Sequence, residues 1–163
     1  MKREVVTIGV YGFTEQTFLC NLRDAGVTTL CDVRLRRGMR GKAYSFANST
    51  ALQRSLKEMG VAYLHRKDLA PSKETRAIQK HVDASAKILK RERTALSSQF
   101  VSRYEDENLS SFDAVAFLSE CLPGTIGLLC VETNPTACHR FLIADHLART
   151  AMVGVRHLCP SAL

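Results

Sequence analysis

The hydrophobic positions of this chain fall into short, uniformly apolar runs separated by longer amphipathic segments. Runs of this kind, rich in Val, Ile and Leu, are typical of strands that are buried on both faces. Between them, leucines and aromatic residues recur at helical spacing, as in residues 14–25 and 49–59. This alternation predicts an α/β fold: a mostly parallel, doubly wound sheet of about five strands with helices on both faces. The expected strands are residues 5–9, 27–33, 61–65, 126–131 and 153–158.

A charged segment interrupts the alternation at about residues 67–108. Ile78, Val82, Ala86 and Leu89 form one apolar stripe in it, which predicts a long surface helix with that stripe packed inward. Its charged side, around residues 80–103, is interpreted as a solvated face or a partner surface. The sequence thus predicts one domain over residues 1–163 with a charged helical insertion.

The residues that follow this insertion predict one more helix before the fourth strand. Residues 110–113 have the spacing of a capping box. The expected helix behind it holds Val115, Leu118 and Leu122.

Composition narrows the class of protein. The chain has 163 residues, of which 45% are hydrophobic and 24% charged, as in a globular domain. It shows neither an apolar run long enough to cross a membrane nor a secretory signal, so we expect no membrane partner and a cytoplasmic location. Its six cysteines lack the spacing of a disulfide framework and are expected to be free thiols.

The net charge of +7 is concentrated in one part of the chain. Residues 33–57 contain seven cations and no acid, so the rest of the chain is neutral. Such a stretch attracts anions, above all phosphates, although it also suits a solvated loop. Tyr44 and Phe46 would be available to stack on bases. The candidate nucleic-acid contacts are Arg36, Arg37, Arg40 and Lys42.

Polar residues stand where the first two strands end, which is where doubly wound sheets bind ligands. Asp32 and Arg34 share one side of the second strand end, where they could hold a substrate anion or a catalytic group, or form a structural ion pair. Tyr11 and Gly12 follow the first strand. They could contact a ligand or simply form a tight turn.

The most informative segment is residues 130–140. Asn134 and Pro135 suit the start of a helix, which puts Cys138 near its unpaired amides and next to His139 and Arg140. These neighbours favour a thiolate nucleophile, although a small buried thiol would also fit. Glu132 could act as an acid, a base or an orienting group, and Arg140 could bind an anion at the helix start.

Two sharper motifs do not fit this segment. The sixth residue after Cys130 is Thr136 rather than the arginine of a phosphatase or sulfurtransferase loop. Cys130, Cys138 and His139 also lack zinc-knuckle spacing, so no metal site is expected, and no cofactor is indicated.

When these segments are taken together, the chain resembles the family called domain of unknown function 488. The matching segments are residues 7–9, 32–34, 60–64, 129–132, 138–140 and 142–144. The resemblance implies a compact α/β domain and assigns no activity. It implies motif residues at Asp32, Arg34, Glu132, Cys138, His139 and Arg140.

Two functions follow as hypotheses. The first is an enzyme acting on a phosphate-bearing, nucleotide or nucleic-acid substrate. In it Cys138 is the nucleophile, Glu132 and Asp32 are catalytic carboxylates, and Arg34, Arg140, His139, Tyr11 and Gly12 bind the substrate. The alternative is a non-catalytic nucleic-acid-binding protein that uses residues 34–57. The expected partner is therefore an anionic small molecule or a nucleic acid.

Overall fold

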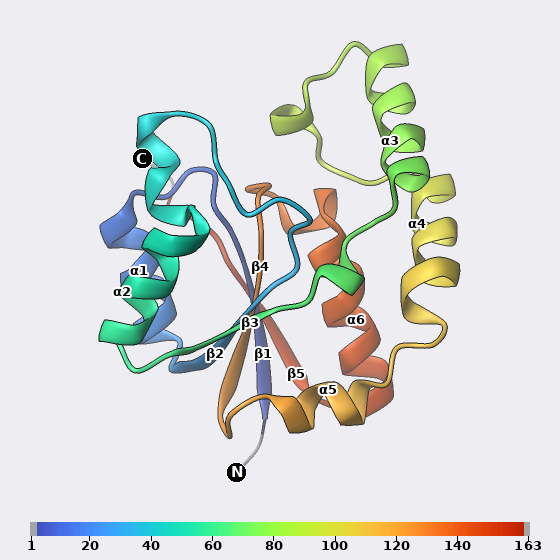
Figure 1. Ribbon diagram of the computed structural model, residues 1–163. Helices are drawn as coiled ribbons and strands as arrows, with labels where there is room; N and C mark the ends of the chain where they lie inside the picture. Colours follow the sequence, from blue (N-terminus) through green and yellow to red (C-terminus); the bar gives the residue numbers. More distant parts are fainter. Residues whose placement is uncertain (1–2, 162–163) are drawn as a thin grey trace.

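The computed structural model describes residues 3–161 and contains a five-stranded sheet whose paired strands are all parallel (Figure 1). The strand order is β3-β2-β4-β1-β5. This confirms the predicted α/β fold and each expected strand to within one residue at either end. The strands are β1 (Glu4–Gly9), β2 (Val27–Asp32), β3 (Ala62–His65), β4 (Thr125–Cys130) and β5 (Gly154–Leu158).

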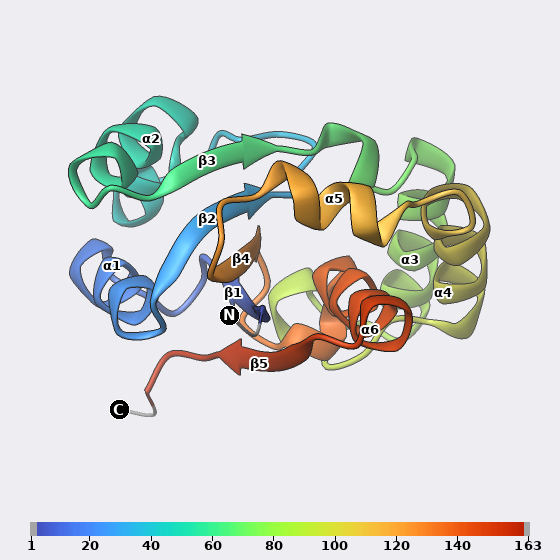
Figure 2. The ribbon, with the colours of Figure 1, turned by 90° about the horizontal axis from the view of Figure 1, so that it is seen from below.

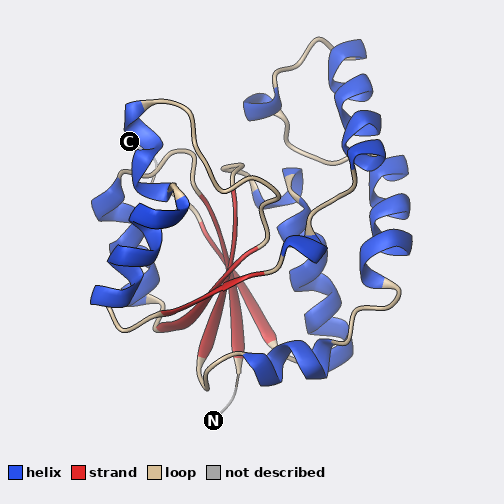
Figure 3. Ribbon diagram, viewed as in Figure 1, coloured by secondary structure: helices blue, strands red, loops and turns tan. Residues whose placement is uncertain are grey.

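Helices cover both faces of the sheet (Figures 2 and 3). On one face α1 (Glu15–Asp24) and α2 (Ser49–Glu58) pack on buried strand residues such as Ile8 and Leu30. On the other face α6 (His139–Ala151) packs on alternate strand residues such as Val5 and Ile126, and α4 (Ser98–Tyr104) and α5 (Ala114–Glu120) pack against α6 in the same core. Because side chains alternate along a strand, each apolar run supplies both layers of core.

The chain leaves the neighbouring parallel strands β1 and β4 toward opposite faces of the sheet. After β1 the chain enters α1 on one face, and after β4 it enters α6 on the other face. Their last residues, Gly9 and Cys130, are partners in the register. Diverging connections from neighbouring parallel strands leave a crevice at their carboxyl ends, which is where such sheets bind ligands.

The charged segment differs from its prediction. It is not one long helix, because α3 (Lys73–Ser85) and α4 are separated by a loop that contains a 3₁₀ turn, Lys90–Glu92. The predicted apolar stripe was also wrong: Ile78 and Val82 are half-buried and Leu89 is 54% exposed. The buried face of α3 is polar instead, and it carries Thr75, Gln79 and Asp83. Their hydrogen bonds replace the hydrophobic contacts that the pattern had suggested.

The helix before β4 starts later than the predicted capping box. Asp113 caps α5 by accepting a hydrogen bond of 2.9 Å from the Ala116 amide. Phe117 is therefore buried, while Val115 is 67% exposed. Of the three residues expected in this helix, Val115 and Leu118 lie in α5, and Leu118 is half-buried against the core. Leu122 lies beyond the end of α5 and is 49% exposed.

The start of α6 also differs in detail. Asn134 caps a 3₁₀ turn, Pro135–Ala137, and α6 itself begins at His139 with Cys138 as its N-cap. Cys138 thus lies one residue before the first residue of α6 rather than inside its first turn.

Two expectations about the chemistry of the chain can be compared with the structure. All six cysteines are free thiols. Within residues 3–161 no helix combines the length and the apolar character that a membrane span requires.

Gly9 is required for space rather than for its backbone conformation. A Cβ on Gly9 would lie 1.9 Å from the carbonyl oxygen of Glu132 and 3.0 Å from a guanidinium nitrogen of Arg140. We expect Gly9→Ala to lower the free energy of unfolding by about 2–3 kcal/mol, because both contacts must shift. Urea denaturation measures this change. Gly38→Ala is the matched control, since nothing lies near its Cβ position, and an equal effect of the two variants would contradict the steric argument.

Candidate active site

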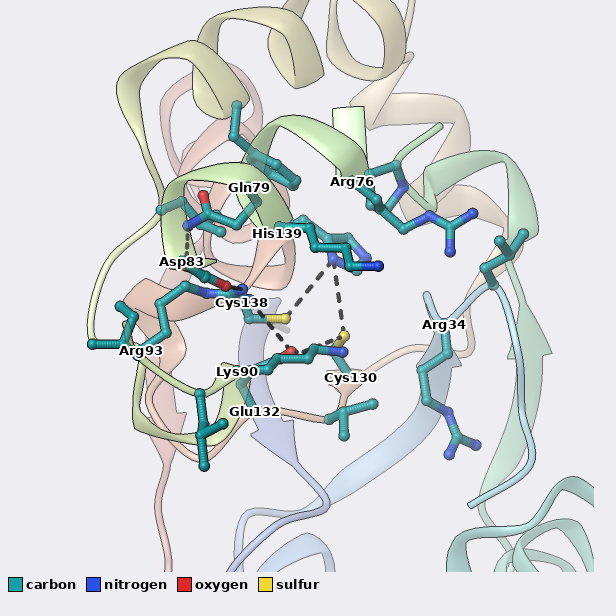
Figure 4. Close-up of a pocket in the computed structure, with 18 of the residues that line it drawn as sticks. Arg34, Arg76, Gln79, Asp83, Lys90, Arg93, Cys130, Glu132, Cys138 and His139 are labelled. Atoms are coloured by element: carbon teal, nitrogen blue, oxygen red, sulfur yellow. Dashed lines mark hydrogen bonds and ion pairs between the residues drawn. The ribbon is translucent and has the colours of Figure 1, made fainter. Parts of the chain in front are cut away.

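A pocket of about 540 Å³ lies beyond the carboxyl ends of β2 and β4 (Figure 4). This volume is in the range of small-molecule sites. The sheet ends and the start of α6 form its floor, and α3 and the loop behind it form a wall. The lining residues come from 34–36, 76–84, 88–96 and 130–139, together with Pro71 and Phe100.

Two thiols and an imidazole meet at the floor of this pocket. The Nδ1 atom of His139 lies 3.8 Å from the sulfur of Cys138 and 3.9 Å from the sulfur of Cys130. The three donor atoms all lie within 4.8 Å of one another. Cys130 ends β4 and Cys138 caps α6, so the turn between the strand and the helix brings the two thiols together. We call these three residues the thiol cluster.

The backbone fixes the orientation of the His139 ring. Its Nε2 atom lies 3.0 Å from the carbonyl oxygen of Val33, which can only accept, so Nε2 carries the proton that is donated there. Nδ1 is then the nitrogen that exchanges a proton with the thiols. Burial lowers the pKa of His139, but the Cys138 thiolate and the Val33 carbonyl outweigh it, and the pKa lies above its ordinary value.

The pKa values of the two thiols are shifted in opposite directions. Burial opposes ionisation of Cys138, but the Cys130 thiol and the charges of His139 and Arg140 outweigh it and lower the Cys138 pKa well below its ordinary value. The neighbouring Cys138 and burial instead raise the pKa of Cys130 well above its ordinary value. The cluster can therefore hold one thiolate at Cys138, paired with the His139 imidazolium.

Glu132 lies beside the cluster and is paired with two cations. Its carboxylate lies 3.1 Å from Lys90 and 3.5 Å from Arg93, and its other oxygen accepts from Cys130 at 3.8 Å. Burial and the nearby Cys138 raise the pKa of Glu132, and Lys90 partly offsets this. A buried carboxyl group with a raised pKa binds a proton more readily than an exposed one, as a general acid requires.

Arg93 joins the charged segment to the site. Its guanidinium donates to Asp83 on α3 at 2.8 Å and to the Ala137 carbonyl at 2.9 Å, besides its contact with Glu132. Gln79 completes the polar face of α3 by donating to Asp83 and accepting from the Ser97 amide, both at 2.8 Å. These bonds hold α3 over the thiol cluster.

Three further cations line the pocket and are not paired with an acidic side chain of residues 3–161. Arg76 and Lys80 stand one turn apart on α3, and Arg36 lies in the loop after β2. All three are exposed, and among residues 3–161 no ion pair involves any of them. An anion that enters the pocket would meet their charges first.

Sequence reasoning missed most of this wall, because the charged segment was interpreted as a solvated face or a partner surface. The spacing of Thr75, Gln79 and Asp83, four residues apart, was the available signal. The residues that were not foreseen are Arg76, Gln79, Lys80, Asp83, Lys90, Arg93 and, as a member of the cluster, Cys130.

Asp32 and Arg34 form a buried ion pair, which was one of the two alternatives for them. The guanidinium of Arg34 donates to both Asp32 oxygens at 2.9 and 2.8 Å and to the Ala47 carbonyl at 2.9 Å. Asp32 also accepts from the Tyr63 hydroxyl at 2.7 Å. Figure 4 shows the Arg34 guanidinium directed away from the two cysteines. This pair anchors the loop that follows β2.

Arg140 is fully buried and does not line the pocket. It donates to the Glu132 carbonyl at 2.6 Å and to the Thr133 carbonyl at 3.3 Å. The expected anion contact therefore has no geometric support, because Arg140 lies outside the pocket lining and two of its nitrogens donate to these carbonyls. Its buried Nε atom has no hydrogen-bond partner among the described residues. Arg140 instead fixes the turn between β4 and α6 and adds positive charge near Cys138.

Tyr11 and Gly12 also lie outside the pocket lining. The Tyr11 ring packs edge-on against Tyr44 at 5.1 Å, and a Cβ on Gly12 would meet the ring of Pro160. Gly12 has a φ of +86°, as the tight-turn alternative requires.

The basic stretch contributes Arg36 to the pocket, while Arg40 and Lys42 are exposed elsewhere and Arg37 is half-buried. The expectation that Phe46 is available to stack on bases was wrong, and Tyr44 is half-buried. Phe46 is buried against Phe18, and Tyr44 packs on Tyr11. Aromatic residues in this stretch serve the core because the loop folds back over α1.

The thiol cluster is also a set of possible metal ligands. Spacing along the chain had given no reason to expect a metal site, since one residue ends a strand and the other two begin a helix.

Comparison with known proteins gives a family and no activity. The family model described as domain of unknown function DUF488 matches residues 14–147. No curated protein and no solved structure matches the chain.

The buried ion pair can be tested by removing one partner. We expect Asp32→Ala to lower the free energy of unfolding by about 3–5 kcal/mol, because it leaves the Arg34 charge buried without compensation. Urea denaturation measures the loss. The control is Asp145→Ala, which breaks an exposed pair with Arg149 and should cost at most about 1 kcal/mol. Similar losses in the two variants would rule out the anchoring role.

Proposed function

The chain belongs to the DUF488 family, to which no activity is attached, and we propose that it is an enzyme with a thiolate nucleophile that acts on a phosphate-bearing small molecule. The observation that carries this proposal is the position of the thiol cluster. The Cys138–His139 pair lies at the floor of a pocket whose lining includes three cations, Arg36, Arg76 and Lys80, that form no ion pair among residues 3–161. An activated nucleophile next to an anion-attracting wall is typical of an active site.

The lining of the pocket indicates what the substrate looks like. Arg76, Lys80 and Arg36 would bind an anionic group such as a phosphate. The rest of the wall is largely apolar and suits a flat organic group; it includes Leu35, Ile88, Leu89, Leu96 and Phe100. A nucleotide or another phosphate ester with an apolar part combines both features.

The chemistry follows from the proton positions in the cluster. The Cys138 sulfur attacks an electrophilic atom of the substrate and forms a bond to it, and the leaving group departs with the bonding electron pair. The proton that Nδ1 of His139 took from the thiol passes to the leaving group. Water then releases the product and restores the thiol, so atoms and charge balance over the cycle.

Further residues assist this step without contacting the Cys138 sulfur. Glu132 is the second proton carrier near the cluster, and Lys90 and Arg93 hold its carboxylate in place. Arg140 and the Asp32–Arg34 pair are positioning groups, because their guanidinium groups donate to backbone carbonyls. Arg140 does not line the pocket, and Figure 4 shows the Arg34 guanidinium directed away from the two cysteines.

The alternative, non-catalytic binding of nucleic acid by residues 34–57, has weaker support. Of the rings that would stack on bases, Phe46 is buried and the half-buried Tyr44 packs on Tyr11. The exposed cation of this stretch that lines the pocket is Arg36, and it lines the same pocket as Arg76 and Lys80 of α3. The pocket therefore favours a small anionic molecule.

The pH dependence of thiol reactivity tests the nucleophile. Because the pKa of Cys138 is lowered, its thiolate persists as the pH falls. We expect alkylation of Cys138 by iodoacetamide, followed by peptide mass spectrometry, to stay near its plateau at pH 7. A free cysteine standard, with a pKa of about 8.5, should lose reactivity about tenfold per pH unit well below that value.

His139→Gln serves as the matched variant for this measurement. It removes the imidazolium, so the alkylation profile of Cys138 should move to higher pH. If wild-type Cys138 instead follows the free standard, the proposed thiolate is wrong.

Removing the wall cations tests the substrate class separately. We expect Arg76→Ala and Lys80→Ala each to weaken the binding of trinitrophenyl-ATP, followed by its fluorescence, about fivefold. Cys138→Ser should bind this probe as wild type does, because it leaves the wall unchanged. Lys57→Ala, an exposed cation on α2, is the charge-matched control. If it weakens binding as much as Arg76→Ala does, the attraction comes from net charge and not from the pocket.

A further inference from the structure

We propose that the thiol cluster is a zinc site, in which Cys130, Cys138 and His139 bind Zn²⁺ and leave the fourth position open to the pocket. The proposal rests on the placement of three donor atoms, on the group that orients the imidazole and on the charge of the set. Zinc binding itself does not depend on the proposed activity.

The distances between the donors are close to those that a tetrahedral zinc ion imposes. Zinc lies about 2.3 Å from sulfur and about 2.0–2.1 Å from nitrogen, which separates sulfur from nitrogen by about 3.6 Å and sulfur from sulfur by about 3.8 Å. The observed sulfur–nitrogen distances are 3.8 and 3.9 Å, and no pair of donors is more than 4.8 Å apart. An ion could therefore enter with donor movements of less than about 1 Å.

The imidazole already has the orientation of a metal ligand. A ligating histidine usually donates its other N–H to a carbonyl or carboxylate, which fixes the tautomer and the ring plane. In His139, Nε2 donates to the Val33 carbonyl while Nδ1 faces both sulfurs. The Tyr104 ring packs against the imidazole at 5.6 Å and limits its rotation further.

Charge balance explains why this buried place suits a divalent soft cation. Two thiolates and a neutral imidazole cancel the charge of Zn²⁺, so the occupied cluster is neutral in surroundings where an uncompensated charge is costly. Thiolate and imidazole ligands select zinc over Mg²⁺ and Ca²⁺, which require oxygen ligands. Glu132 stays outside the donor set, held by Lys90 and Arg93 beside the open position.

Zinc in this site would also regulate the proposed enzyme. The ion takes the electron pair with which the Cys138 sulfur would attack the substrate, so the zinc-bound form is inactive as a thiol nucleophile. This regulatory part rests on the proposed function, whereas the binding of the ion does not.

Protection from alkylation tests the zinc site on the chain without substitutions. The metal-free protein, kept reduced by a phosphine, is treated with iodoacetamide with and without one equivalent of Zn²⁺ at pH 7. We expect zinc to slow the labelling of Cys138 by at least about tenfold. Cys20 and Cys159, which are partly or fully exposed, should label at the same rate in both samples. Mg²⁺ should protect none of them.

A second readout identifies the ligands. Co²⁺ in place of zinc should give the near-ultraviolet absorption of a thiolate–cobalt bond, and Zn²⁺ should displace it. Cys130→Ser and His139→Gln should each weaken zinc binding by at least about tenfold. Cys121→Ser, which removes a buried thiol outside the cluster, should leave zinc binding unchanged.

The outcomes separate the two proposals. If Cys138 is reactive at pH 7 and zinc gives no protection, or if only a copper(I) salt protects, the zinc site is overturned while the thiolate nucleophile stands. If zinc protects Cys138 but metal-free Cys138 follows the free cysteine standard, the zinc site stands and the proposed nucleophile falls.

Discussion

The geometry of the pocket depends on one buried guanidinium, that of Arg93. It bonds to Asp83 on α3, to the Ala137 carbonyl before α6 and to Glu132 after β4. The packed face of α3 is polar, so hydrophobic burial contributes little to holding this helix in place. The fixed fork of donors in an arginine therefore sets the distance between the wall and the floor.

Because the acidic side chains of this site are buried, each of them requires a cation beside it. In surroundings of low polarity an unpaired charge is costly, and each buried acid here has a cation beside it: Asp32 has Arg34, Asp83 has Arg93, and Glu132 has Arg93 with Lys90. The Cys138 thiolate has the His139 imidazolium in the same way. The remaining cations of the pocket, Arg36, Arg76 and Lys80, are exposed and keep their charge available to a ligand.

Prediction from sequence succeeded where burial is hydrophobic and failed where it is polar. The strands and the helices α1 and α2 follow the apolar periodicity, because burying apolar surface is the main driving force of folding. In α3 the same rule selected the half-buried Ile78 and Val82, whereas Gln79 and Asp83 are inside. Hydrophobicity patterns cannot detect a polar face that is satisfied by residues distant in the chain, such as Arg93.

The sequence by itself determined the alternation of strands and helices along the chain, the carboxyl ends of the strands as the place to look for a site, and Cys138 and His139 as candidate site residues at a helix start. These depend on local periodicity, caps and neighbours. Only the tertiary structure decided that Cys130 joins that pair, that Arg34 and Arg140 serve the fold, and that α3 supplies the cationic wall. The physical reason is that a side chain acquires its role from partners across the fold, and spacing along the chain does not specify them.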